Sequence, residues 1–332
     1  MTLSPPLVFS LTADSDFAGH VAGHAGAEHG SHKERAFEDG EHKIRPTMSV
    51  RERDIYLVQS LYGSPEQAVS DKLIRVLFLL GALRDAGAAR LTMVAPYLGY
   101  SRKDRRTKPR DPVTTRYIAQ LFEAMTIDRF VTLDVHNVAA FQNAFRCPND
   151  MLETRHALID AWLGHNPSPE RLCVASPDVG GVKRADAFRE SLERRLGQEI
   201  PLAFMEKKRS EGRVTGKLVA GDVEGRTVLV VDDLIASGTT MTRAARAFLE
   251  HGAAQVHALA THGLFSEHSD TILATDDLSR LMVSNTVPPF RLRDSAVRDK
   301  LDVIDVTPLL GEAIRRLHTG GSLVELAEGG MA

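Results

Sequence analysis

The stretch VLVVDDLIASGTT, residues 228–240, decides the fold of this chain. It opens with aliphatic residues that have no polar face, which is typical of a strand covered on both sides. Two adjacent carboxylates follow, and then small residues with hydroxyl groups lead into a helix expected over 240–251. Small residues let backbone N–H groups approach a phosphate, and the start of a helix adds positive potential. The stretch therefore predicts a buried strand, a phosphate-binding loop and a helix.

The two acids, Asp232 and Asp233, separate this interpretation from an ordinary turn. A capped strand-to-helix turn is common in α/β proteins and would account for the Ser and Thr residues alone. Such a turn does not require two carboxylates at the end of the strand. Adjacent carboxylates suit the hydroxyl groups of a sugar or a hydrated Mg²⁺ ion. We therefore expect this stretch to bind a ligand that carries a phosphate.

The same alternation of strand and helix extends in both directions along the chain. Further apolar runs predict strands at 54–59, 91–97, 130–135, 172–176, 256–261 and 281–286, beside the one at 227–232. Amphipathic segments between them predict helices at 70–85, 113–124, 184–195 and 240–251. Strands that alternate with helices indicate an α/β fold with parallel, doubly wound sheets. At about 150 residues per domain, 332 residues suggest two domains, with a boundary near 148–158.

Composition and charge exclude several classes of function. The chain is 43% hydrophobic and 26% charged, with a net charge of −3, so no basic excess favours a nucleic-acid partner. The longest apolar run, 74–83, is much shorter than the roughly 20 residues that span a membrane, and the N-terminus lacks a cationic signal segment. Cys147 and Cys173 are too few for a disulfide framework. We expect a soluble cytoplasmic protein without nucleic-acid or membrane partners.

Six further motifs accompany the 228–240 stretch, which by itself looks like a phosphoribosyl-binding signature. They are FEDGE (37–41), SVRERDIYLVQS (49–60), APYLGYSRKDR (95–105), LDVH (133–136), SPDVGGVKRA (176–185) and KKR (207–209). In this order and spacing the motifs resemble the ribose-phosphate pyrophosphokinase family over residues 8–318. An ordered set of this kind is far more specific than any single motif.

The resemblance implies a fold and a reaction. It implies two phosphoribosyltransferase-type α/β domains with helices on both faces of parallel sheets, at 1–152 and 153–318, with a frayed tail at 319–332. The site would lie in the cleft between them, at the carboxyl ends of the strands. The reaction would move the β,γ-pyrophosphoryl group of Mg²⁺-bound ATP to the 1-hydroxyl of ribose 5-phosphate, releasing AMP. A homo-oligomer built on dimers would be the assembly.

On the nucleotide side, the resemblance assigns an adenine-binding hairpin, supplied in the family by a neighbouring subunit. Its residues here are Phe37, Asp39, Gly40 and Glu41. A plain glycine-centred turn explains Asp39-Gly40 equally well. Arg102, Lys103 and His136 would lie at the ATP phosphates, although Lys103 stands where the family usually has Gln. Taken alone, His136 is a common strand-end residue, and an imidazole is a poor Mg²⁺ ligand, so we expect weak metal contact or a phosphate contact.

On the sugar side, Asp178, Gly180 and Gly181 resemble the pyrophosphate loop, and Asp178 with His136 would lie at the metal. Asp232 and Asp233 would bind the ribose. The 5-phosphate loop would comprise Ala236, Ser237, Gly238, Thr239 and Thr240. Lys207 and Arg209 would be the catalytic cations, on a segment at 207–221 whose glycines and charges predict a mobile loop. Without the resemblance, a Lys-Lys-Arg run is usually a solvated surface.

Two departures from the family pattern bear on activity and regulation. Ala236 fills a position where the family usually has an acid, which resembles the loops of ordinary phosphoribosyltransferases and puts substrate affinity or rate in question. Pro109 and the C-terminal 322–326 segment also differ from the usual pattern. We therefore do not infer from the resemblance that phosphate activates this chain or that ADP inhibits it. Ser49 and Arg51 are retained.

Two other interpretations stay open from the sequence. A phosphoribosyltransferase that consumes the activated sugar fits 232–240 and Ala236, but leaves 37–41 and 102–104 unexplained. A non-catalytic regulatory member of the family fits the motifs as well. The retained Lys207, Arg209, His136 and Asp178 count against it.

Overall fold

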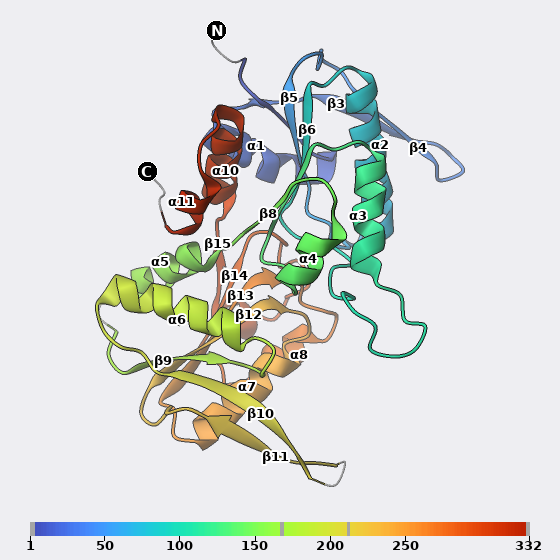
Figure 1. Cartoon of the computed structure of the whole chain (residues 1–332). Helices are drawn as coiled ribbons and strands as arrows, with labels where there is room; N and C mark the ends of the chain where they lie inside the picture. The colour runs from blue at the N-terminus through green and yellow to red at the C-terminus, as the bar shows by residue number, and fades with distance from the viewer. Residues whose placement is uncertain (1–3, 167–168, 211–212, 330–332) are drawn as a thin grey trace. The chain divides into compact units, whose positions relative to one another are not determined.

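The chain forms two compact units. A computed structural model describes residues 4–166, 169–210 and 213–329, with the backbone only at 13 and over 207–218. Unit 1 comprises Met1–Glu153 with Val306–Ala332, and unit 2 comprises Thr154–Asp305. Each contains a sheet of mainly parallel strands flanked by helices, as predicted (Figure 1). In the part of the chain that the structure describes, no helix is long and apolar enough to cross a membrane.

The sheet of unit 1 has the strand order β2-β1-β5-β6-β7-β8, and its neighbouring strands are parallel. The strands are β1 (Leu7–Phe9), β2 (Glu28–His29), β5 (Asp54–Val58), β6 (Arg90–Ala95), β7 (Arg129–Leu133) and β8 (Asn149–Leu152). The 3₁₀ turn η1 (Thr12–Asp14) precedes the helices α1 (Ser15–Ala25), α2 (Val69–Asp85), α3 (Thr114–Ala124) and α4 (Val138–Ala144). β3 (His32–Ala36) and β4 (His42–Pro46) form a separate antiparallel hairpin.

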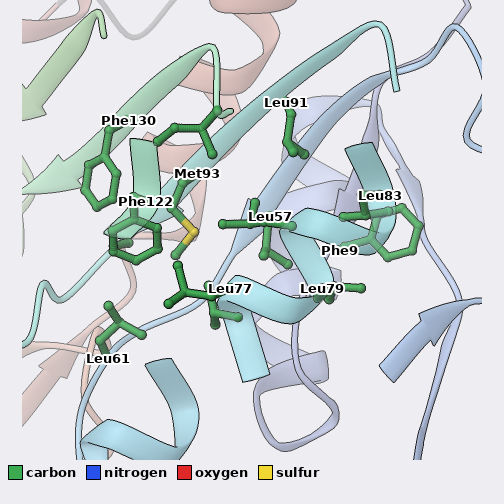
Figure 2. Close-up of a cluster of buried hydrophobic side chains, with 14 of the residues drawn as sticks. Phe9, Leu57, Leu61, Leu77, Leu79, Leu83, Leu91, Met93, Phe122 and Phe130 are labelled. Carbon is green, nitrogen blue, oxygen red and sulfur yellow. The ribbon is translucent and has the colours of Figure 1, made fainter. Parts of the chain in front are cut away.

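Buried aliphatic and aromatic side chains hold the helices of unit 1 on its sheet. Leu77 of α2, Met93 of β6 and Phe122 of α3 belong to one cluster, shown in Figure 2. Phe122 also meets Phe130 of β7 edge-on, with ring centroids 5.0 Å apart. Because the strands are apolar on both faces, they must be covered on both, which explains the continuous apolar runs in the sequence.

Unit 2 has the strand order β11-β10-β9-β12-β13-β14-β15. The strands are β9 (Leu172–Ser176), β10 (Leu202–Ser210), β11 (Arg213–Ala220), β12 (Thr227–Ile235), β13 (Gln255–Gly263), β14 (Arg280–Ser284) and β15 (Leu301–Ile304). The helices are α5 (Arg155–His165), α6 (Val182–Leu196), α7 (Thr239–Glu250), α8 (Ser269–Leu273) and α9 (Ser295–Arg298). Within this sheet only β10 and β11 pair antiparallel among the described strands.

The segment 207–221, predicted as a mobile loop, is for the most part a β-hairpin. β10 pairs with β9 only through residues 202–204, and then continues with β11 as its partner. Lys207 is opposite Lys217 in this ladder, and the register shifts between Lys208 and Arg209. The glycines and charges of the segment suggested a loop, but Val214, Thr215 and Val219 favour extended backbone. The prediction of a loop was wrong for the backbone at 207–210 and 213–220.

The end of the chain corrects the predicted domain limits. Residues 306–318, predicted in the second domain, belong to unit 1 because α10 (Thr307–Thr319) packs against α1. The two helices approach so closely that a Cβ added to Gly311 would lie 2.3 Å from Cβ of His24. The tail predicted as frayed contains α11 (Leu323–Ala327), where Ser322 caps the helix by accepting from Glu325 N and Leu326 is buried.

A buried histidine in unit 2 makes stability depend on pH. His257 of β13 is 4% exposed, and its Nδ1 accepts a hydrogen bond of 2.9 Å from Nε1 of Trp162, the chain's single tryptophan. Burial lowers the pKa of His257 to about 4, and the nearby Arg280 acts in the same direction. The native histidine is therefore neutral where an unfolded one would take up a proton.

We expect unit 2 to lose about 2 kcal/mol of unfolding free energy between pH 7 and pH 5 from this residue, since the neutral form is favoured only when folded. Stability from a lowered histidine pKa is present above the unfolded value of 6.5 and is lost as pH falls toward 4. Urea unfolding followed by Trp162 fluorescence measures it. His257→Gln should flatten the pH dependence, and an unchanged slope in that variant would contradict the assignment.

Candidate active site

The turn between β3 and β4 exposes an aromatic ring and two acids. Phe37 N donates to Glu41 O at 2.8 Å, and Gly40 N donates to Phe37 O at 3.1 Å. Gly40 has a φ of +90°, which only glycine adopts without strain. Glu41 N donates to Asp39 Oδ1 at 3.1 Å. The ring of Phe37 is 37% exposed, with the guanidinium of Arg35 5.0 Å from its centroid. The predicted hairpin exists, and its tip presents a flat apolar surface beside carboxylates.

The carboxyl edge of the unit 1 sheet brings the next group of predicted residues together. Arg102 and Lys103 lie in the loop after β6, and His136 lies just after β7, the neighbouring parallel strand. The two loops are joined directly, because Nδ2 of Asn137 donates to Oδ2 of Asp104 at 2.6 Å. Asn137 also caps α4 by accepting from Ala140 N. Arg102 and His136 are exposed at this edge.

Lys103 has partners within its own loop. Its ammonium donates to Oδ2 of Asp111 at 2.5 Å and to Oγ1 of Thr107 at 2.9 Å. The bond from Lys103, and next the one that Thr107 Oγ1 donates to Asp111 Oδ2, hold the pKa of the Asp111 carboxyl far below its usual range. In this structure the charge of Lys103 is therefore compensated by a residue that the sequence analysis did not single out.

In unit 2, the segment after β9 forms a tight turn into α6. Ser176 Oγ donates to Asp178 O at 2.6 Å, and Gly181 N donates to Asp178 Oδ1 at 3.1 Å. A Cβ on Gly181 would lie 2.6 Å from Ser176 Oγ, so the turn requires glycine there. Gly181 is the N-cap of α6, and Gly180 and Asp178 are exposed. The start of a long helix carries positive potential, which suits an anion.

The loop after β12 has the form that the sequence predicted. Gly238 has a φ of +88° and is the N-cap of α7, and a Cβ there would lie 2.5 Å from a methyl carbon of Leu273. Thr239 N donates to Ser237 Oγ at 3.3 Å, and the hydroxyls of Ser237 and Thr239 are 3.0 Å apart. Ala236 and Thr240 complete the loop. The strand runs beyond its predicted end at 232 to Ile235, so both acids lie within β12.

Arg184 is a residue of this site that the sequence analysis did not assign. Its Nη1 lies 2.9 Å from Oδ1 of Asp232 and 3.3 Å from Oδ1 of Asp233. Asp233 is 3% exposed. Burial, together with the negative charge of Asp233, raises the pKa of Asp232, and Arg184 opposes that rise. Arg184 thus favours the ionised form of Asp232, and it links the helix after the 178–181 turn to the end of β12.

Lys207 and Arg209 lie on β10, after the point where that strand leaves β9. Because β9, β10 and β12 are parallel neighbours, the carboxyl ends of all three meet at one edge of the unit 2 sheet. The side chains of Lys207 and Arg209 lie outside the described residues. Their backbone positions place them at the edge that carries the 178–181 turn and the 236–240 loop.

Comparisons with known proteins agree over both units. Residues 7–125 match a family model described as the N-terminal domain of ribose phosphate pyrophosphokinase. Residues 175–327 match a model described as a phosphoribosyl synthetase-associated domain. A ribose-phosphate pyrophosphokinase of Gloeobacter violaceus is 36% identical over 321 residues, which cover 95% of this chain and 91% of the relative.

Two further comparisons extend the similarity. A ribose-phosphate pyrophosphokinase of Caldanaerobacter subterraneus is 33% identical over 320 residues, which cover 96% of each chain. The crystal structure of phosphoribosylpyrophosphate synthetase from Mycobacterium smegmatis superposes with a TM-score of 0.84 at 30% identity, covering 96% of this chain and 100% of that one. The predicted fold class and the resemblance are confirmed.

Proposed function

The chain belongs to the ribose-phosphate pyrophosphokinase family of enzymes, and on this premise we propose that it transfers the β,γ-pyrophosphoryl group of ATP to the 1-hydroxyl of ribose 5-phosphate, with release of AMP. One observation carries the proposal. Two turns that lead into helices, 178–181 and 236–240, follow the adjacent parallel strands β9 and β12, with two carboxylates beside them. This arrangement suits a pentose that carries phosphate groups at both ends.

The sugar would be held through hydrogen bonds and the helix start of α7. Asp232 and Asp233 would accept hydrogen bonds from the ribose hydroxyls while Arg184 keeps them oriented. The 5-phosphate would accept hydrogen bonds from the backbone N–H groups and hydroxyls of 237–240. Ala236 adds no negative charge to this loop, so nothing there repels the phosphate. Fixing the 1-hydroxyl in line with the nucleotide supplies the positioning on which phosphoryl transfer depends.

The transferred group would gain charge stabilisation from Lys207 and Arg209. The reaction needs no covalent intermediate on the protein, only cations near the transferred group and the leaving oxygen. The hairpin β10–β11 leaves the sheet edge next to the 178–181 turn, which supports this role for its two cations. The sugar hydroxyl would attack the β-phosphorus of ATP and lose its proton to solvent, the bond from that phosphorus to the α-phosphate oxygen would break, and AMP would leave.

The nucleotide would lie against the unit 1 residues. Phe37 would stack on the adenine, and Asp39 and Glu41 would accept its amino group. Arg102 and His136 would face the phosphates, at the edge where their two loops are joined through Asp104 and Asn137. Because the family borrows the hairpin from a neighbouring subunit, the proposal includes a homo-oligomer built on dimers.

Phe37→Ala should raise KM for ATP about tenfold with little change in kcat, because a stacked base contributes on the order of 1–3 kcal/mol. Phe37→Trp keeps the flat surface and should keep KM near that of the unsubstituted chain. The KM for ribose 5-phosphate should not move in either variant. An unchanged KM for ATP in the alanine variant would remove the hairpin from the nucleotide site.

The donor set fits a Mg²⁺ ion that arrives with the nucleotide. Among the described residues, no group of three or more His, Cys, Asp or Glu side chains is arranged to hold a metal. Mg²⁺ is commonly held by one or two carboxylates together with substrate phosphates and water. Asp178, exposed beside the 178–181 turn, offers such a carboxylate, and His136 would contact the ion weakly or bind phosphate. When bound, the ion would neutralise phosphate charge. ATP and sugar phosphates are cytoplasmic metabolites, so we place the protein there.

Incubation of the purified chain with Mg²⁺, ATP and ribose 5-phosphate tests the proposal. AMP should appear only when both substrates are present, and in equal amount to phosphoribosyl pyrophosphate. A phosphoribosyltransferase would consume that product with a base and form no AMP from ATP. A regulatory subunit would be inactive alone and would copurify with an active relative.

A further inference from the structure

The loop between β6 and α3 concentrates positive charge beside the proposed nucleotide site. Within 101–111 it carries six cations against two acids, namely Arg102, Lys103, Arg105, Arg106, Lys108 and Arg110 against Asp104 and Asp111. The loop lacks helix and strand over 96–113. Like charges repel one another and ordering a long loop costs conformational entropy, so a defined conformation requires specific bonds.

One carboxylate oxygen accepts four of those bonds. Oδ2 of Asp111 accepts from Lys103 Nζ at 2.5 Å, Thr107 Oγ1 at 2.8 Å, Lys108 N at 3.0 Å and Thr107 N at 3.1 Å. Lys103 Nζ also donates to Thr107 Oγ1 at 2.9 Å. We call Lys103, Thr107 and Asp111 the clasp. It folds the exposed cationic part of the loop back toward Lys103.

The base of the loop is fixed independently on α3 and β7. Thr114 Oγ1 donates to Tyr100 O at 2.8 Å, and Thr115 Oγ1 donates to Ser101 O at 3.1 Å. Asp104 accepts from Asn137, in the loop after β7. Arg102 therefore lies between two anchored residues, and the clasp closes the rest of the loop over this base.

We propose that Asp111 is a positioning residue for the nucleotide-phosphate loop, acting through Lys103. Lys103 stands where the family usually has Gln, and its charge pairs with Asp111 in the clasp rather than with the ATP phosphates. This inference rests on the proposed function, because it assigns the loop to the nucleotide. Lys103 and Asp111 act as one unit in this inference, so the loss of either side chain should raise KM for ATP in the same way.

A double-mutant cycle on Lys103 and Asp111 tests the inference. Asp111→Ala and Lys103→Gln should each raise KM for ATP about three- to tenfold, the scale of one lost hydrogen bond at a partly exposed site, and leave kcat within about twofold. The double variant should be no worse than the more affected single variant. Asp111→Asn, which keeps an acceptor for the two backbone N–H groups, should fall between Asp111→Ala and the unsubstituted chain.

The opposite pattern would overturn the inference. If Lys103 binds the phosphates directly, Asp111→Ala frees it and leaves KM for ATP unchanged or lower. Lys103→Gln would then raise KM for ATP by the same factor whether residue 111 is Asp or Ala, while Asp111→Ala alone would not raise it.

Limited trypsin digestion gives a readout that needs no activity. Without the clasp, cleavage after Arg102, Lys103, Arg105 or Arg106 should be at least about threefold faster, since proteases act on opened loops. Asp16→Ala, which removes an exposed acid from α1, is the matched control and should be cut like the unsubstituted chain. Equal cleavage rates in Asp111→Ala and in the unsubstituted chain would overturn the inference that the clasp holds the loop in its conformation. Faster cleavage in a protein that forms no AMP from ATP and ribose 5-phosphate would instead overturn the proposed function and the nucleotide role with it.

Discussion

Lys207→Ala is expected to lower kcat about 10²–10³-fold, the effect of losing one transition-state donor worth about 2–4 kcal/mol. The charge that develops during transfer of the pyrophosphoryl group has no other proposed cationic partner on β10 than Arg209. Ground-state binding depends on other residues, so KM for both substrates should change little. The melting temperature should stay the same, because the backbone pairing of Lys207 with Lys217 does not involve the side chain.

Lys208→Ala is the matched control for this prediction, since it removes the same charge one residue along the same strand. Its kcat should stay close to that of the unsubstituted chain. Near-normal turnover in Lys207→Ala, or an equal loss in both variants, would contradict the assignment of Lys207 as a catalytic residue.

Arg184→Ala is expected to lower kcat/KM for ribose 5-phosphate about 10²-fold. Removing the guanidinium takes away the ion pairs that Asp232 and the buried Asp233 form with it. The pKa of Asp232, already raised by burial and by Asp233, should rise further, and its protonated form is a poorer acceptor for a ribose hydroxyl.

The pH profile distinguishes this effect from simple loss of structure. In Arg184→Ala the acid limb of kcat/KM for ribose 5-phosphate should move to higher pH, because a raised carboxyl pKa means that activity is lost sooner as pH falls. Arg184→Lys should restore part of the activity and shift the limb back. Arg189→Ala, which breaks ion pairs with Asp186 and Glu193 on the same helix, is the control and should leave the profile unchanged. An unshifted limb in Arg184→Ala would contradict the role of Arg184.

The sequence predicted the central strands of both sheets because burial on both faces leaves continuous apolar runs. Residues 172–176 coincide with β9, and 54–59 differs from β5 only by its last residue. Short strands such as β1 and β2 carry too few residues to show such a run. The position of α10 in unit 1 depends on the packing of Gly311 against α1, and no local sequence pattern predicts a contact between helices so far apart in the chain.

The candidate site was predictable where its residues follow one another in the chain. The 236–240 loop and the 178–181 turn are local structures, and the glycines that they require are visible in the sequence. Arg184 and Asp232 are 48 positions apart and meet only because β9 and β12 are adjacent. The Lys103–Asp111 bond could not be predicted for a different reason: with six cations and two acids within 101–111, the sequence allows many pairings.

The most direct test of the central claim follows the fate of the two terminal phosphoryl groups of ATP. Phosphorus NMR of a reaction with Mg²⁺, ribose 5-phosphate and ATP that carries ¹⁸O as a label on the non-bridging oxygens of its β-phosphorus should show the label in the 1-pyrophosphate of the sugar, with one AMP for each product molecule. Label found in ADP, in free pyrophosphate or still in ATP would contradict the account.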